Sequence, residues 1–360
     1  MESDTSCQMD AVNGTESPES DTTAVIAATK LTVPIVFGLI FLVGLLGNGT
    51  LVLIFARHPF MRNVPNIYIV NLALGDLLVI VCAVPFTTTI YTFDEWPYGP
   101  AICRLTETTK DISIGVSVFT LTALSAERYY IIVDPIKRHL SSRTWTIVMV
   151  LVIWLISIIF SIPSAVFSRV HALPDANNES VAFCDPFPAV GGVSYGKPLV
   201  VFKCLVFYAL PLSVIAAYYV KIARHLVNSA RNIPGEIQGQ HAQIQARKKV
   251  AKIVLIFVII FSLCFLPYHI YMLWYYLHPT SNCDYNLFWH VLKIVGFSFS
   301  FINSCINPIA LYFISDTFRS LFDRYLFCRR KTFDGRHAKS SITSRRTKTE
   351  RKKMAQLFGD

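Results

Sequence analysis

Seven long apolar stretches dominate this sequence and limit what it can fold into. A helix needs about 20 apolar residues to cross the ~30 Å hydrocarbon core of a bilayer, where its backbone polar groups must bond to one another. All seven stretches are long enough, so the sequence predicts an all-α membrane protein, a seven-transmembrane helix bundle. The predicted spans are 31–57, 66–91, 101–133, 143–167, 198–225, 248–277 and 286–313.

The distribution of charge predicts the orientation of these spans. The net charge is +10, but acidic residues gather before the first span and basic residues gather after the last. Loops after odd-numbered spans are basic, as at Arg62 and Arg138, and loops after even-numbered spans are acidic, as at Glu95 and Asp284. This is the asymmetry of the positive-inside rule, so we expect an outer N-terminus and no nucleic-acid partner.

The topology divides the chain into three parts. They are an extracellular tail (1–30), a seven-helix domain that ends in a short amphipathic helix (31–328) and a basic, disordered cytoplasmic tail (329–360). Asn13 and Asn178 begin Asn-X-Ser/Thr sequons on the outer side and are predicted glycosylation sites. Cys328 follows the amphipathic stretch and is a predicted palmitoylation site.

One carboxylate, that of Asp76, is predicted deep inside the bilayer, where a charge costs ~2.5–3.5 kcal/mol on insertion scales. Hydroxyl and amide groups fall at a similar depth in other spans, and a carboxylate ringed by such oxygens suits a hard cation, here sodium. The candidate ligands are Asp76, Ser117, Asn303, Ser304 and Asn307. A water-filled polar network without an ion is the alternative. Apart from this possible sodium ion, we expect no cofactor and no metal.

The inner end of the third span and three later prolines indicate a part that moves. Arg128 lies between Glu127 and Tyr129, and the adjacent carboxylate reduces the cost of desolvating the guanidinium. Each of the last three spans contains a proline, which interrupts helical hydrogen bonding and lets the helix bend at a defined point. These prolines are Pro211, Pro267 and Pro308.

The same residues belong to a series of short motifs that occur in order along the spans. The series is Gly47-Asn48, Leu72-Ala73-Leu74-Gly75-Asp76, Trp96 before Cys103, Glu127-Arg128-Tyr129, Trp154, Pro211, the stretch from Phe261 to Pro267, and Asn307-Pro308. Over about residues 31–328 the sequence resembles the rhodopsin-like (class A) G-protein-coupled receptors. The stretches from Ser113 to Tyr129 and from Asn303 to Tyr312 are similar to bombesin-type neuropeptide receptors. Phe265 and the run Cys-Phe-Leu-Pro-Tyr-His around it are most similar to the invertebrate CCHamide receptors.

The resemblance implies a plasma-membrane receptor for an amidated neuropeptide, and not an enzyme. It implies signalling through a heterotrimeric G protein of the Gq class with calcium release, and contacts with membrane lipid. Arrestin and receptor kinases would act on serines and threonines of the C-terminal tail. Candidate ligand-binding residues are Lys110, Asp111, Lys203, Tyr268, His269, Met272 and Lys293. Candidate G-protein-coupling residues are Glu127, Arg128, Tyr129, Pro135, Ile136 and Tyr219, and candidate switch residues are Phe261, Phe265, Pro267, Pro308 and Tyr312.

The resemblance also implies a disulfide bond between Cys103 and Cys184. The predicted topology puts both residues on the outer side, which is oxidising. Cys7 and Cys283 are predicted on the same side, and whether they pair stays open.

Some positions depart from relatives that bind other ligands. Lys110 stands where amine receptors have an aspartate, and Phe301 stands where opsins have the lysine that binds retinal. Tyr275 and Phe297 align with arginines that vertebrate bombesin receptors use, so a bombesin-like peptide need not bind in the same way. A receptor for another class of peptide is the nearest alternative. A transporter or channel is more distant, because such proteins normally show internal repeats or a polar pore lining.

Overall fold

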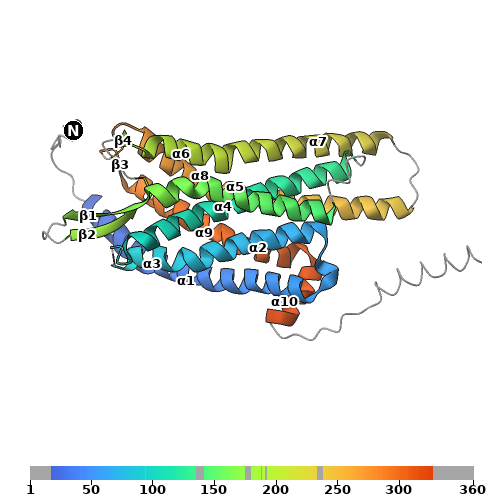
Figure 1. Ribbon diagram of the computed structural model, residues 1–360, viewed down its shortest axis with the longest axis horizontal. Helices are drawn as coiled ribbons and strands as arrows, with labels where there is room; N and C mark the ends of the chain where they lie inside the picture. The colour runs from blue at the N-terminus through green and yellow to red at the C-terminus, as the bar shows by residue number, and fades with distance from the viewer. Residues whose placement is uncertain are drawn as a thin grey trace, which may run out of the picture. The chain divides into compact units, whose positions relative to one another are not determined.

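All seven predicted spans form helices in the computed structural model (Figure 1). The structure describes residues 18–93, 95–134, 142–174, 180–187, 189–190, 193–232, 238–281 and 283–326. Predictions for Asn13, Asn178, Pro135, Ile136, Cys7 and Cys328 lie outside these residues.

The bounds of the helices agree with the predicted spans to within a few residues at most ends. The long helices are α1 (Pro18–Arg57), α2 (Val64–Cys82), α3 (Val84–Phe93), α4 (Gly99–Ile132), α5 (Arg143–Phe167), α6 (Gly196–Cys204), α7 (Leu210–Asn232), α8 (Gln238–Leu277) and α9 (Leu287–Ile314). A 3-10 helix, η1 (Pro59–Met61), follows α1, and a π-helix, η3 (Leu205–Ala209), joins α6 to α7. The larger differences are at α1 and α8, which begin earlier than the spans predicted from 31 and 248, and at α7, which ends later than the span predicted to end at 225.

Two of the predicted spans are interrupted near a proline. The second span is divided at Ala83 into α2 and α3, because Pro85 has no amide hydrogen to continue the helical ladder. In the fifth span the widened turn η3 comes directly before Leu210 and Pro211. The sequence predicted each of these spans as one continuous helix, and in both places that prediction was too simple.

α4 occupies the interior of the bundle, where it contacts α2, α5, α7 and α8 (Figure 1). Six helical segments among the described residues are long and apolar enough to cross a membrane. α4 is not one of the six, since it carries charged side chains such as Glu107, Asp111 and Arg128, but it has 34 residues. Neighbouring helices shield those charges, so a polar helix is tolerated at this position.

The pattern of burial on α5 indicates that lipid surrounds the bundle. The buried residues of α5 include Ser157, Ser161 and Ser164, whereas large apolar residues such as Leu151 and Leu155 are exposed. This reverses the pattern of a soluble protein, in which apolar side chains face the core. Small polar residues are favoured between membrane helices, because they allow the backbones to approach closely and can bond across the interface.

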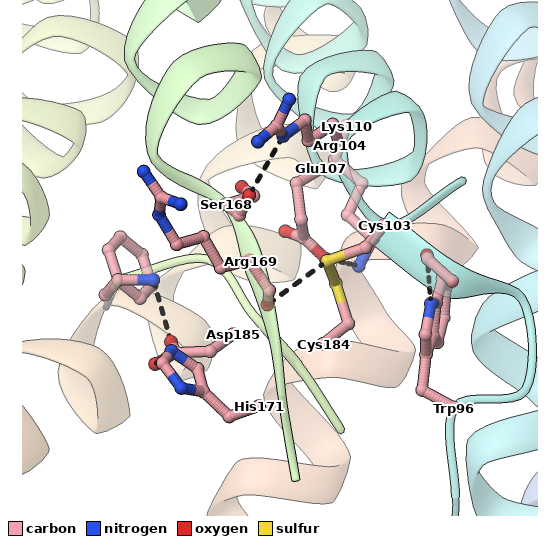
Figure 2. The surroundings of a disulfide bond; sticks show 12 residues. Trp96, Cys103, Arg104, Glu107, Lys110, Ser168, Arg169, His171, Cys184 and Asp185 are labelled. Atoms are coloured by element: carbon pink, nitrogen blue, oxygen red, sulfur yellow. Dashed lines mark hydrogen bonds and ion pairs between the residues drawn. A yellow bond between two sulfur atoms is a disulfide. The ribbon is translucent and has the colours of Figure 1, made fainter. Parts of the chain in front are cut away.

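A β-hairpin lies between α5 and α6, in a loop for which the sequence predicted no strands. β1 (Arg169–Pro174) pairs antiparallel with β2 (Ser180–Asp185), and Val170 lies opposite Cys184. A second, two-residue pair follows, β3 (Ala189–Val190) with β4 (Val193–Ser194). Cys184 forms the predicted disulfide with Cys103 at the outer end of α4, which confirms that pairing (Figure 2).

The residues from Ser315 onward form a separate unit. Its described part is α10 (Asp316–Leu326), which confirms the short helix predicted after the seventh span. Asp316 stands in its first turn and pairs with Arg319 at 3.5 Å between Oδ1 and Nη1. An acid at this position also suits the helix dipole.

α8 and α9 pack closely beside Pro267, at Gly296 of α9. A Cβ atom at Gly296 would lie 2.7 Å from the backbone nitrogen of Tyr268 and 3.0 Å from the carbonyl carbon of Pro267. The obstructing atoms are backbone, so Gly296→Ala should force the helices apart and lower stability by ~1–3 kcal/mol. We expect a lower melting temperature of the purified receptor and less receptor at the cell surface.

Gly49→Ala is the matched control for this substitution. A Cβ atom at Gly49 meets no other atom within 4 Å, so the added methyl group should be tolerated. Equal melting temperatures for the two variants would show that α8 and α9 do not approach as closely as described.

Candidate functional site

The outer half of the bundle encloses a cavity of about 270 Å³, here called the inner cavity. Residues of α2, α3, α4, α6, α8 and α9 line it, and Cys184 and Phe187 of the hairpin loop cover it. Its charged lining residues are Glu107, Lys110, Asp111, Lys203 and Lys293. Charged groups in a largely apolar pocket are the usual means of fixing the orientation of a ligand.

Two ion pairs neutralise most of this charge. Lys110 Nζ lies 2.7 Å from Glu107 Oε1, and Lys203 Nζ lies 2.8 Å from Asp111 Oδ2. The second pair is the more deeply buried, and Lys203 also donates a hydrogen bond of 2.9 Å to Ser164 Oγ. These contacts join α4, α5 and α6 at the wall of the cavity.

Lys293 of α9 differs from the other two lysines of the cavity. Among the described residues it is paired with no carboxylate, and it is half-buried. The three lysines and two acids therefore leave the lining with one excess positive charge.

A second cavity of about 670 Å³, here called the outer cavity, adjoins the first. Both cavities are lined by Cys184, Pro186, Phe187, Met272, Lys293 and Phe297. Aromatic side chains dominate the rest of its lining, which includes Phe183, Tyr271, Tyr275, Tyr276 and Tyr285, with Asp185 as its acid. Tyrosine and phenylalanine offer large contact areas at low cost in conformational entropy, which is typical of surfaces that bind peptides.

The outer ends of α8 and α9 are held together by aromatic stacking and by the loop between them. The rings of Trp274 and Trp289 stack with centroids 3.7 Å apart. In the loop, Thr280 and His278 hydrogen-bond to Asp284 Oδ2 at 2.6 and 2.7 Å, and these bonds hold the pKa of Asp284 below its usual range. Cys283 is disulfide-bonded; Cys7, its suggested partner, lies outside the described residues.

Six of the seven candidate ligand-binding residues line the inner cavity. They are Lys110, Asp111, Lys203, Tyr268, Met272 and Lys293. The seventh, His269, is buried and packs against the ring of Tyr208 at 4.7 Å, and it lines neither of the two cavities.

Sequence reasoning did not single out Glu107, Phe187 or Asp185. Glu107 had a detectable pattern, because it lies three and four residues before Lys110 and Asp111 and therefore on the same face of α4. Phe187 and Asp185 had no such pattern, since the conformation of the loop decides which of its side chains face the cavities.

The predicted sodium ligands lie together in the core of the bundle. Asp76, Ser117, Asn303, Ser304 and Asn307 are all buried. Asn307 Nδ2 donates to Asp76 Oδ2 at 2.9 Å. Asp76 Oδ1 is buried and accepts no hydrogen bond from the part of the chain that the structure describes. Carboxylate, hydroxyl and amide oxygens with an unsatisfied acceptor among them fit a sodium ion, and they fit a water molecule equally well.

The inner cavity extends toward this polar core. Ser117, Asn303 and Ser304 line it, as does Phe265, whose ring packs on Phe261 at 4.6 Å. Phe265 therefore lies where the cavity meets the middle of α8, near Pro267 inside the same helix. A ligand in the inner cavity can therefore contact α8 two residues before Pro267.

A buried arginine lies at the inner end of α4. Arg128 donates to Glu127 Oε2 through Nε at 2.6 Å and also through Nη2, and both residues are buried. The ring of Tyr129 packs against Tyr218 of α7 at 5.4 Å. Tyr219 Oη donates to the carbonyl of Ala251 at 2.9 Å, which connects α7 to α8. The pairing of Glu127 with Arg128 agrees with the sequence prediction.

Comparisons with known proteins agree with this architecture. Residues 47–312 match the family described as 7 transmembrane receptor (rhodopsin family). The chain is 53% identical over 303 residues to the neuropeptide CCHamide-1 receptor of Drosophila melanogaster. The matched region covers 82% of this chain and 60% of the length of that relative. The chain belongs to the rhodopsin family of seven-transmembrane receptors, multi-pass proteins of the plasma membrane whose N-terminus lies outside the cell.

Proposed function

We propose that this chain is a receptor for an amidated neuropeptide of the CCHamide type, and that it signals through a G protein of the Gq class to release calcium. The observation that carries the proposal is the charged inner cavity and the aromatic outer cavity that adjoins it, beneath a hairpin tied to α4 by a disulfide. The likeness to a CCHamide-1 receptor supports this choice of ligand.

Activation in this proposal is a shift between two populations of the bundle. Peptide binding favours a state in which α8 swings outward about Pro267. The contact of Tyr219 with Ala251 and the pair of Glu127 with Arg128 belong to the resting state. Their release would open an inner cleft for the C-terminal helix of the G-protein α subunit, with Arg128 beneath it and Ile136 alongside.

The proposal also assigns roles outside the described residues. Receptor kinases and arrestin would act on the serines and threonines of the C-terminal tail, and Cys328 would carry palmitate. Asn13 and Asn178 would carry glycans on the outer side. The receptor carries out no chemical step, so we propose no enzymatic activity.

Calcium release tests the proposed ligand and pathway together. Cells that express the receptor and a calcium reporter should respond to synthetic amidated CCHamide-1, and an inhibitor of Gq should abolish the response. Untransfected cells serve as the control. A receptor that reaches the surface but stays silent to CCHamide-1 would contradict the choice of ligand.

Arg128→Ala separates ligand binding from coupling. The residue lies at the inner end of α4, far along the helix from Lys110, so CCHamide-1 binding should be retained within about threefold, while calcium release is lost. Arg62→Ala is the control, because Arg62 is an exposed inner-side arginine whose bonds go to the carbonyls of Phe55 and Ala56. Full signalling by Arg128→Ala at equal surface expression would mean that this arginine does not couple the receptor.

We further propose that the Asp76 cluster binds sodium in the resting state. The buried oxygen of Asp76 without a partner supports this proposal, because an ion would satisfy it. The ion would hold α2, α4 and α9 together through Asp76, Ser117 and Asn303. Movement of α9 at Pro308 would dismantle the site, so sodium and agonist should oppose each other.

Asp76→Asn tests the sodium site. Replacing sodium by N-methylglucamine at constant ionic strength should raise the affinity of the wild-type receptor for CCHamide-1, by roughly 5–150-fold if the coupling is typical. The asparagine variant should lose this dependence, because it keeps the shape of the side chain without its charge. Equal sodium sensitivity in both receptors would favour a hydrated network with no ion. Constant ionic strength removes the effect of screening at the acidic outer face.

A further inference from the structure

Glu107 and Lys110 form a pair of opposite charges at the wall of the inner cavity. They lie one helical turn apart on α4, with Lys110 Nζ 2.7 Å from Glu107 Oε1. Their side chains are 15% and 17% exposed, and both line the cavity. Figure 2 shows the two side chains extending toward the Cys103–Cys184 disulfide, so the pair lies beneath the tethered hairpin.

The hydrogen-bonding capacity of this pair is only partly used. Glu107 Oε2 makes no hydrogen bond to the part of the chain that the structure describes. An ammonium group has three donors, and among the described residues Lys110 uses one of them, on Glu107; its nearest ring, Phe301, is 5.8 Å away. The cavity wall therefore presents a free acceptor next to free donors.

The other ion pair of the cavity is less available. Asp111 and Lys203 are only 6% and 9% exposed. Lys203 also donates to Ser164 and lies over the ring of Phe187 at 5.0 Å. This pair is buried among its own partners, so it serves the packing of α4, α5 and α6. Both pairs line the inner cavity, and that of Glu107 and Lys110 is the more accessible from it.

A primary carboxamide is the chemical group that matches an acceptor beside a donor. Its NH₂ group would donate to Glu107, and its carbonyl oxygen would accept from Lys110. A carboxylate has two acceptors and no donor, so one of its oxygens would face the Glu107 carboxylate. Like charges brought together out of water repel strongly, and this repulsion is a means of rejecting the wrong ligand.

We propose that Glu107 and Lys110 bind the C-terminal carboxamide of the peptide, and that Glu107 excludes the same peptide with a free C-terminal acid. The inference rests on the proposed function and adds to it a residue that sets specificity. Its ligand group is the amide terminus, and the aromatic outer cavity takes the residues that precede it.

The excess charge of Lys293 is the main argument for the opposite preference. A free carboxylate held between Lys110 and Lys293 would make the receptor prefer the acid. Lys293 lines both cavities, however, whereas Glu107 and Lys110 line the inner one. The proposal therefore assigns the terminus to the inner pair and leaves Lys293 to contact the peptide chain where it passes between the cavities.

The test compares two forms of one peptide on several receptors. Synthetic CCHamide-1 is applied as the amide and as the free acid. For each receptor, the half-maximal concentration of the acid for calcium release is divided by that of the amide, so a high ratio means preference for the amide. In wild type the amide should be at least about tenfold more potent. Glu107→Gln should lower the ratio about tenfold, chiefly by improving the acid, because the repulsion is removed and Lys110 is left to attract the carboxylate.

Two further variants complete the design. Glu95→Gln is the matched control, because it removes a carboxylate from an exposed outer-side residue that lines neither cavity, so it should leave the ratio within about twofold of wild type. Lys110→Met leaves Glu107 without its counter-charge, so it should raise the ratio. Glu107→Gln and Lys110→Met should shift the ratio in opposite directions. If Glu107→Gln does not reach the surface, Lys110→Met therefore tests the proposal by itself, and a ratio that does not rise would contradict it.

The failures of the inference and of the proposed function are distinguishable. A wild-type receptor that ignores the amide overturns the proposed function. A receptor that responds to the amide but has the same ratio in Glu107→Gln overturns the assignment of Glu107 alone. Preference of the wild-type receptor for the free acid would overturn the assignment in favour of Lys293. A shift in Glu95→Gln as large as that in Glu107→Gln would overturn it in favour of the general electric field of the outer face.

Discussion

The pairing of the acidic side chains of α4 with bases is the interaction on which the rest of the bundle depends. An ionised side chain within a bilayer is costly unless it meets a partner of opposite charge or lies away from lipid. α4 satisfies both conditions, because α2, α5, α7 and α8 surround it and its acids each contact a base. Those pairs are Glu107 with Lys110, Asp111 with Lys203, and Glu127 with Arg128. A helix with this composition is favoured at the centre of the bundle, where its neighbours keep its charges away from lipid.

This arrangement places residues of the proposed ligand cavity and the proposed coupling residue on one helix. Lys110 and Asp111 belong to the outer half of α4 and Arg128 to its inner end. In the proposed activation, the element that moves should therefore contact α4 and reach both the cavity and the inner end of the bundle. α8 fits this description, because it contacts α4, its Phe265 lines the cavity, and its Ala251 accepts a hydrogen bond from Tyr219 of α7. Pro267 lies between the two halves of the receptor as a natural point of bending.

Most of the fold could be predicted from the sequence because a bilayer imposes simple rules. The seven spans, their orientation and the bond between Cys103 and Cys184 follow from apolar length, charge asymmetry and the family likeness. The sequence did not predict the division at Ala83 or the hairpin from Arg169 to Asp185. Prolines are common in membrane helices and need not break them, and strands in an outer loop are not subject to the rules of the bilayer.

Most members of the candidate site were predicted from the sequence, with Glu107 as the main omission, but the pairing of their charges was not. Lys110, Lys203 and Lys293 are alike in the sequence, as lysines near the outer ends of three helices. In the fold, Lys203 is neutralised and buried by Asp111, Lys110 shares its charge with Glu107, and Lys293 faces the junction of both cavities. The free energy available to a ligand depends on which polar groups remain unsatisfied, since a group already paired offers little. Selectivity for the end of a peptide is therefore a property of the pairing. The pair of Glu107 with Lys110 forms within α4, but the packed bundle decides that this pair keeps unsatisfied groups at the cavity while Asp111 and Lys203 satisfy each other.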